Sequence, residues 1–177
     1  MNAERNYDDP QWCEAEYNPR LRVPDFATFA PKWEQWSIAA RAHLSPQTNI
    51  AYGKHPRELM DIFRAPSPRG ACLFIHGGYW RSFSKDIFSW VAEPFLKKDL
   101  SVIVVNYPLC PEVTIADIVG SVQQSVCALM HSHLTEAERA HFVVAGHSAG
   151  GYLAAALAST AWHKFGLARN PFTGAVP

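Results

Sequence analysis

Residues 142–160 limit the folds available to this chain more than any other feature. Over these residues an apolar strand leads through a glycine-bounded turn into a helix. Phe142–Ala145 is a short apolar run typical of a strand buried on both faces, and a helix is predicted over Gly150–Thr160. The turn between them, GHSAG at 146–150, matches G-x-S-x-G, in which glycines permit a very tight bend. Such a bend lifts the hydroxyl of Ser148 clear of the sheet and aims the N–H of Ala149 at a developing oxyanion. We therefore predict Ser148 as a nucleophile; the alternative is a glycine-rich turn that contains a serine by chance.

A second glycine turn follows another buried strand. Ala71–Ile75 is continuously apolar, and HGGYW at 76–80 comes directly after it. This pattern is typical of an oxyanion loop, in which glycines let the backbone approach the substrate and offer N–H groups to negative charge. Gly77 and Gly78 are the predicted donors, whereas His76 is interpreted as a structural residue of the turn. The alternative is an ordinary glycine turn.

From about Arg57 onward, apolar strands alternate with helices. The predicted strands are Glu58–Phe63, Ala71–Ile75, Val102–Val105 and Phe142–Ala145, and another strand begins at Phe172–Val176. The predicted helices are Asp86–Lys97, Thr114–Leu134, a short one that opens at Thr135, and Gly150–Thr160. This alternation predicts an α/β fold, with a mainly parallel sheet and helices on both faces.

The first 52 residues differ from the rest in being rich in aromatics and prolines. They contain one predicted helix, Pro31–Leu44, which a proline opens and Ser45-Pro46 ends. We interpret 1–52 as a lead-in segment that packs on a core domain formed by 53–177.

Composition excludes several classes of partner. Sixteen basic and sixteen acidic residues give a formal net charge of zero, so binding to nucleic acid or an anionic membrane has no electrostatic support. No stretch reaches the roughly 18 uninterrupted apolar residues of a membrane span. The four cysteines form no C-x-x-C pair, which favours reduced thiols in a cytoplasmic protein. The eight histidines have no metal-ligand spacing on a shared helix face, so a zinc site has no support.

Three segments together resemble one family. Residues 76–86 (HGGYWRSFSKD), 105–111 (VNYPLCP) and 146–151 (GHSAGG) are similar to the arylformamidase (kynurenine formamidase) group of the α/β-hydrolase superfamily. The resemblance implies a serine esterase that hydrolyses N-formylkynurenine to kynurenine and formate without a cofactor. It also implies that Ser148 is the nucleophile and that the N–H groups of Gly77 or Gly78 and of Ala149 form the oxyanion hole.

The sequence departs from that family after the nucleophile. In this fold the triad acid and histidine follow the serine, but no Asp or Glu comes after Ser148, and the only later histidine is His163, interpreted as a surface residue. Ser82 and Lys85 match S-x-x-K, which we attribute to chance. We expect the chain to correspond to the N-terminal portion of the fold, with the C-terminal strands missing. Two functions therefore stay open: a serine hydrolase of this class, or an inactive fragment or binding module that keeps the same fold.

The predicted substrate is a small aryl formamide or ester. Tyr79 and Trp80, beside the oxyanion glycines, suggest a pocket for an aryl group, although they could equally be ordinary aromatic packing. An apolar strand at 142–145 left as a sheet edge would favour association with other chains, including a second copy.

Overall fold

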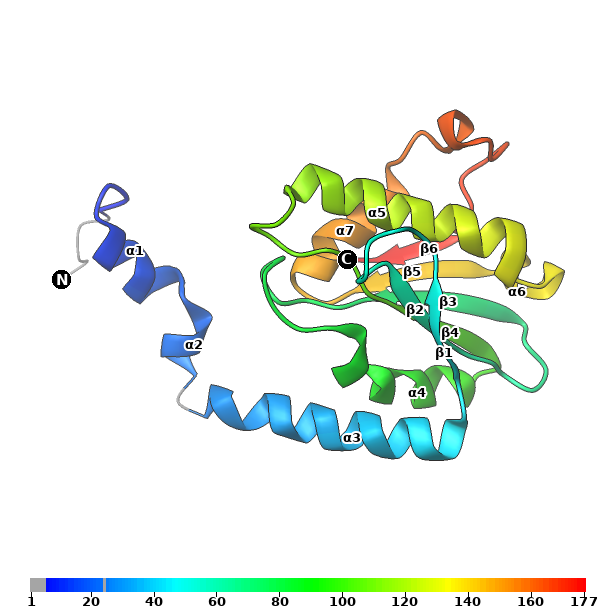
Figure 1. The fold of residues 1–177 in the computed structure, drawn as a ribbon, viewed down its shortest axis with the longest axis horizontal. Helices are drawn as coiled ribbons and strands as arrows, with labels where there is room; N and C mark the ends of the chain where they lie inside the picture. The colour runs from blue at the N-terminus through cyan, green and yellow to red at the C-terminus, as the bar shows by residue number, and fades with distance from the viewer. Residues whose placement is uncertain (1–5, 24) are drawn as a thin grey trace.

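The sheet at the centre of the molecule has six strands. The structure is a computed structural model that describes residues 6–23 and 25–177, so the first five residues of the predicted lead-in segment lie outside the described residues. The strands are β1 (Gln47–Ala51), β2 (Leu59–Phe63), β3 (Gly70–Ile75), β4 (Leu100–Val105), β5 (Phe142–Gly146) and β6 (Gly174–Val176). They are arranged in the order β1-β2-β4-β3-β5-β6 (Figure 1).

The pairing in this sheet is mixed but mainly parallel. β3 pairs in parallel with β4 and with β5, and β6 pairs in parallel with β5. β2 pairs antiparallel with both β1 and β4. The predicted α/β fold class is confirmed.

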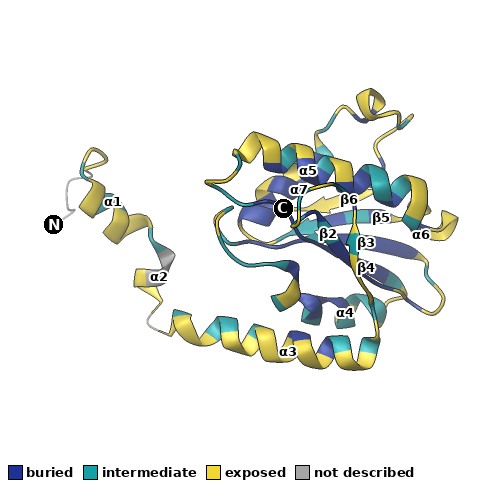
Figure 2. Cartoon of the chain, in the orientation of Figure 1, coloured by how far each residue is buried: buried dark blue, intermediate teal, exposed yellow. Residues whose placement is uncertain are grey.

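Helices cover both faces of the sheet. The α-helices are α1 (Pro10–Tyr17), α2 (Pro19–Arg22), α3 (Phe29–Leu44), α4 (Ala92–Leu96), α5 (Ile115–Ala128), α6 (Glu136–Ala140) and α7 (Ala149–Ala158). Shorter elements are the 3₁₀ helices η1 (Phe26–Thr28), η2 (Lys85–Ile87), η3 (Ser89–Val91) and η5 (Trp162–Phe165), and the π turn η4 (Leu129–His133). Alternate residues of β4 show the two layers: Ile103 and Val105 belong to the core under α5 and α7, whereas Val102 and Val104 face η3 and α4. Figure 2 shows the buried sheet between these exposed outer surfaces.

The predicted helix Asp86–Lys97 is not continuous. The chain forms η2 and η3 first, and the α-helix begins only at Ala92. Pro94 explains the late start, because proline has no N–H to donate and its ring clashes with the carbonyl four residues before it. It is tolerated only within the first turn of an α-helix.

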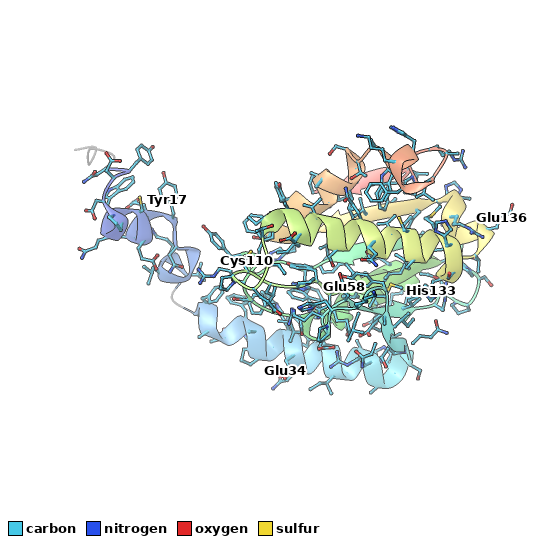
Figure 3. The ribbon with its side chains drawn as sticks, turned by 45° about the horizontal axis from the view of Figure 1, so that its top comes forward. Tyr17, Glu34, Glu58, Cys110, His133 and Glu136 are labelled. Carbon is cyan, nitrogen blue, oxygen red and sulfur yellow. The ribbon has the colours of Figure 1, made fainter. Side chains whose placement is uncertain are left out.

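The region before residue 52 contributes more structure than its sequence suggested. α3 begins at Phe29, two residues before the predicted start, and packs against η2 and η3. β1 lies at one end of the sheet, although no strand was predicted there. α1 has no buried residue. Figure 1 shows α1 and α2 standing away from the body, and Figure 3 places Tyr17 on that arm, far from His133 and Glu136.

The far edge of the sheet is β6 and not β5. Thr173 donates its N–H to Phe142 O over 2.7 Å, and the register then runs from Val143↔Gly174 to Ala145↔Val176. All three residues of β6 are exposed. Association of chains through this edge stays a prediction.

Candidate active site

Ser148 lies at the bend between β5 and α7. Its backbone angles, φ 55° and ψ −116°, fall outside the regions that residues with a side chain ordinarily adopt. Holding such a conformation costs roughly 1–3 kcal/mol and persists only where the surroundings enforce it. The Ser148 side chain is exposed to solvent. The strand–turn–helix context predicted for this residue is therefore present, in a strained form typical of functional sites.

Two glycines make this bend possible through close packing. A Cβ on Gly146 would lie 2.0 Å from Gly150 O, and one on Gly150 would lie 2.0 Å from Ile75 O at the end of β3. Both clashes involve backbone atoms, which cannot swing aside. The first turn of α7 is thus pressed directly onto the end of the neighbouring strand.

The HGG segment lies against Ser148. A Cβ on Gly77 would lie 2.6 Å from His147 O and 3.2 Å from Ser148 Cβ. His147 donates its N–H to Ile75 O over 3.1 Å, which ties the bend to the strand that precedes this segment. The loops after β3, β4 and β5 gather at the same end of the sheet (Figure 1). The two sequence motifs therefore meet in space.

Three backbone donors beside Ser148 have no acceptor in the part of the chain that the structure describes. Across residues 6–23 and 25–177, no hydrogen bond uses the N–H of Gly77, Gly78 or Ala149. Gly77 and Ala149 are buried, and unpaired buried N–H groups are rare in proteins. The N–H of Ala149 also stands at the N-terminus of α7, where the helix dipole favours negative charge. These groups can bind an anion without breaking any hydrogen bond within the described chain.

Aromatic residues border this arrangement. Tyr79 is 70% exposed, and Trp80 is partly buried with its ring 5.5 Å from that of Tyr152, edge to face. Tyr152 lies in the first turn of α7 and donates its N–H to Ser148 O over 3.3 Å. Tyr152 was not predicted from the sequence; its place four residues after Ser148, on the helix, was the available signal.

His76 is a buried structural residue, as the sequence suggested. Its ring stacks on Tyr107 at 4.3 Å between centroids and on Phe88 at 5.8 Å. Nδ1 lies 2.7 Å from Gly77 O, and Nε2 lies 3.2 Å from Asn106 Oδ1. Burial lowers the pKa of His76 to about 4, so the ring is neutral at pH 7.

This burial predicts a pH dependence of stability. Because the folded-state pKa lies below the ordinary 6.5, the unfolded chain binds the proton more readily, and stability falls as the pH drops from 6.5 towards 4. We expect a loss of about 2–3 kcal/mol between pH 7.5 and 4.5 from this residue. Urea unfolding of the wild type and of His76→Gln measures it. The exposed His163→Gln should keep the wild-type slope; an equal slope in all three proteins would contradict the assignment.

Within the described residues, no basic side chain forms a hydrogen bond with the Ser148 hydroxyl. Within the described residues the Ser148 side chain makes no hydrogen bond, and His163 is exposed at η5. Lys85, of the S-x-x-K match, is only 2% exposed and pairs with Asp61 at 2.8 Å and Asp86 at 2.9 Å. Lys85 is therefore held by ion pairs that serve the fold.

Trp33 reaches the site from α3. Its ring contacts His147 at 6.5 Å, Phe83 at 6.1 Å and Phe88 at 5.6 Å between centroids. Nothing in the local sequence marks this role, because Trp33 is separated from His147 by more than half of the chain. The lead-in helix thus contributes an aromatic side chain next to the residue that precedes Ser148.

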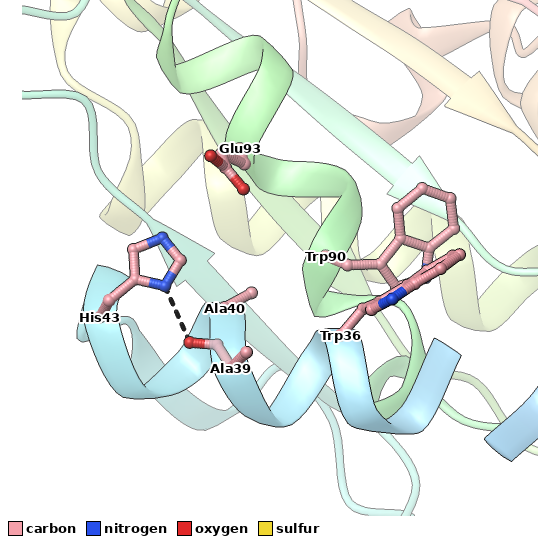
Figure 4. A pocket seen from close by; sticks show the side chains of 6 residues that line it. All are labelled: Trp36, Ala39, Ala40, His43, Trp90 and Glu93. Atoms are coloured by element: carbon pink, nitrogen blue, oxygen red, sulfur yellow. Dashed lines mark hydrogen bonds between the residues drawn. The ribbon is translucent and has the colours of Figure 1, made fainter. Parts of the chain in front are cut away.

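A hollow lies away from this region. It has a volume of about 280 Å³ between α3 and the η3–α4 segment (Figure 4). Its lining is Trp36, Ala39, Ala40, His43, Trp90 and Glu93. None of these belongs to the bend or to the HGG segment, so the hollow is separate from the candidate site.

Other kinds of site find no support among the described residues. No group of three or more His, Cys, Asp or Glu side chains could hold a metal ion there. In the same part of the chain, no helix has the length and apolar character needed to cross a bilayer. All four cysteines are free thiols.

Comparison with known proteins identifies relatives of about twice the length. A family profile described as the alpha/beta hydrolase fold matches residues 72–171. The chain is 27% identical over 161 residues to the kynurenine formamidase of Danio rerio, covering 88% of this chain and 53% of that protein. The kynurenine formamidase of Salmo salar is also 27% identical, over 169 residues, covering 92% of this chain and 54% of that protein. The chain thus spans about half the length of these curated relatives.

The chain also matches about half the length of the solved structures that it resembles. A Silicibacter sp. TM1040 protein assigned as a thioesterase has a TM-score of 0.74 and 33% identity, covering 80% of this chain and 53% of that one. Esterase B of Lactobacillus rhamnosis has a TM-score of 0.59 at 19% identity, covering 85% and 55%, and so shares the fold. The matched part of this chain corresponds to about half of each of these structures.

Proposed function

Because the chain belongs to the α/β-hydrolase fold family, we propose that it is the nucleophile-bearing part of an esterase-like serine hydrolase, with Ser148 as nucleophile. It resembles the N-terminal part of the kynurenine formamidases that it matches. The N–H groups of Gly77, Gly78 and Ala149 are the proposed oxyanion hole.

One observation carries this proposal. A strained, exposed serine stands beside three backbone N–H groups that have no acceptor in the described chain. Packing alone would not require that arrangement, because strained backbone and unpaired donors both cost free energy. An oxyanion formed at Ser148 would give the donors their acceptor.

The chemistry is acyl transfer. The Ser148 oxygen attacks the carbonyl carbon while its proton passes to a base, and the carbonyl oxygen becomes an oxyanion held by the three N–H groups. The C–O or C–N bond then breaks, the leaving group takes a proton, and water later releases the acyl group from the serine. Within the described residues the chain supplies nucleophile and oxyanion hole but no base, so we expect little turnover from it alone.

An aryl formamide or ester is the substrate class we propose. The names of the matched relatives support a formamide, and the aromatic rings of Tyr79, Trp80, Tyr152 and Trp33 support a flat apolar group beside the serine. We also propose a cytoplasmic location and no cofactor. In a protein that joins this chain to a triad acid and histidine, much faster turnover of short p-nitrophenyl esters than of N-formylkynurenine would contradict the formamide assignment.

A stoichiometric label tests the nucleophile without needing turnover. A p-nitrophenyl alkylphosphonate forms a stable adduct with an activated serine and releases one p-nitrophenolate. We expect one adduct per chain, on the peptide that contains Ser148, and formation about 10²–10³-fold faster than at other serines because the oxyanion hole stabilises the attack. Release of p-nitrophenolate at pH 9 and peptide mass mapping provide the measurement.

Two variants control this label. Ser148→Ala should form no adduct, whereas Ser159→Ala, an exposed serine at the other end of α7, should react like the wild type. An adduct of equal yield in Ser148→Ala would refute the nucleophile. A folded wild type without any adduct would favour the alternative, a non-catalytic module of the same fold.

A further inference from the structure

The loop that carries the proposed oxyanion glycines is held in an unfavourable conformation. Gly78 has φ 118°, and the three non-glycine residues Tyr79, Trp80 and Phe83 have φ 57°, 57° and 73°. Side chains disfavour this left-handed region, so the loop would relax unless other groups fixed it. Its own backbone supplies short-range support, from Arg81 and Ser82 N–H to Gly78 O, and one contact with the loop after β4, in which Cys110 donates its N–H to Trp80 O over 2.8 Å.

Arg57 reaches the last strained residue of this loop. It lies between β1 and β2, and its Nη2 donates to Phe83 O over 2.7 Å. Its Nε donates to Tyr107 O over 2.9 Å, on the loop after β4. One planar guanidinium therefore joins the loop after β3 to the loop after β4, at the end of the sheet where Ser148 lies.

The same guanidinium also acts on the start of the loop. Nη2 donates over 3.0 Å to Asn106 Oδ1, which lies 3.2 Å from His76 Nε2. The other ring nitrogen of His76 lies 2.7 Å from Gly77 O. Phe83 is thus held directly by Arg57, whereas Gly77 is reached through Asn106 and the stacked His76 ring, which in its neutral form donates to only one of the two oxygens.

The guanidinium of Arg57 donates to neutral oxygens. Its hydrogen bonds in the described chain go to two carbonyls and one amide oxygen. A planar fork with several donors suits three acceptors in different directions, and a lysine ammonium does not reproduce that geometry. The contact therefore serves to orient the groups that carry these three oxygens.

We propose that Arg57 is the positioning residue of the oxyanion loop, holding the 77–83 segment so that its N–H groups face Ser148. The catalytic part of this proposal, that the held N–H groups serve Ser148, rests on the proposed function. Its structural part, the conformation of the loop, can be tested separately.

Hydrogen exchange and the phosphonate label together test the proposal. In Arg57→Met we expect amides of residues 78–84 to exchange at least 10-fold faster, while those of β3, β4 and β5 keep their protection. Adduct formation at Ser148 should slow 10- to 100-fold. In Arg57→Ala, added methylguanidine should restore both readouts. Arg69→Met removes an exposed arginine that lies 3.8 Å from Asp99, and should match the wild type.

The outcomes separate the two proposals. Unchanged exchange at 78–84, or faster exchange that extends equally into the three strands, would overturn the role of Arg57. Failure of methylguanidine to restore the loop would do the same. If wild-type Ser148 forms no adduct, the proposed function fails, and loop exchange alone decides about Arg57. Should Arg57→Met not fold, Arg57→Lys, which keeps the charge but not the fork, is expected to show the same loop-specific exchange.

Discussion

Replacing Gly150 with alanine is expected to lower the free energy of unfolding by about 3 kcal/mol or more. The new Cβ would lie 2.0 Å from Ile75 O and 2.7 Å from His76 O. Neither atom can move freely, because Ile75 pairs with β4 and β5 on both sides. The helix must therefore move off the strand, and Ser148 would move away from Gly77 with it. Urea unfolding followed by circular dichroism measures the loss.

Gly120 provides a matched control for this substitution. It lies inside α5, is exposed, and a Cβ there would meet nothing within 4 Å. Gly120→Ala should raise the free energy of unfolding by about 0.5–1 kcal/mol, because alanine loses less backbone entropy in a helix. If Gly150→Ala were as harmless as Gly120→Ala, the close contact between α7 and β3 would be wrong.

Removing the Lys85 ammonium is expected to have an effect of similar size. Lys85 and Asp61 form an ion pair at 2.8 Å, with side chains 2% and 1% exposed. Asp61 Oδ1 also accepts from the N–H of Asn49 over 2.8 Å, whereas its Oδ2 has no partner among the described residues. In Lys85→Met the Asp61 carboxylate would stay buried without its cation, which costs about 3–5 kcal/mol. Equilibrium urea unfolding of Lys85→Met and wild type gives the difference.

Two further variants assign that cost to the buried charge. Adding Asp61→Asn to Lys85→Met should recover more than half of the loss, because the uncompensated carboxylate is then gone. Lys97→Met removes an exposed lysine that pairs with Glu93 on α4, and should leave the urea midpoint unchanged. A double variant no more stable than Lys85→Met alone would show that packing, and not charge, explains the loss.

The strands of the parallel sheet could be predicted because their signal is local. β3 and β4 are buried on both faces and β5 is partly covered on one face, and each contains a continuous apolar run next to turn residues. β1 gave no such signal: four of its five residues are exposed, and its place depends on pairing with β2. The prediction of one continuous helix from Asp86 was wrong for a different reason. The helical spacing of apolar residues does not reveal where Pro94 allows an α-helix to begin.

For the candidate site, the sequence by itself determined the chemistry of the two turns. The glycines around Ser148 and after His76 mark sharp bends that expose a hydroxyl and backbone N–H groups, and those are properties of consecutive residues. Only the tertiary structure decided that the bends touch, because β3 and β5 are neighbours in the sheet. It also decided that Arg57 and Trp33 belong to the same region. Arg57 forms hydrogen bonds with two residues that lie 26 and 50 positions away along the chain. Such contacts depend on the path of the whole chain and cannot be predicted from a local sequence pattern.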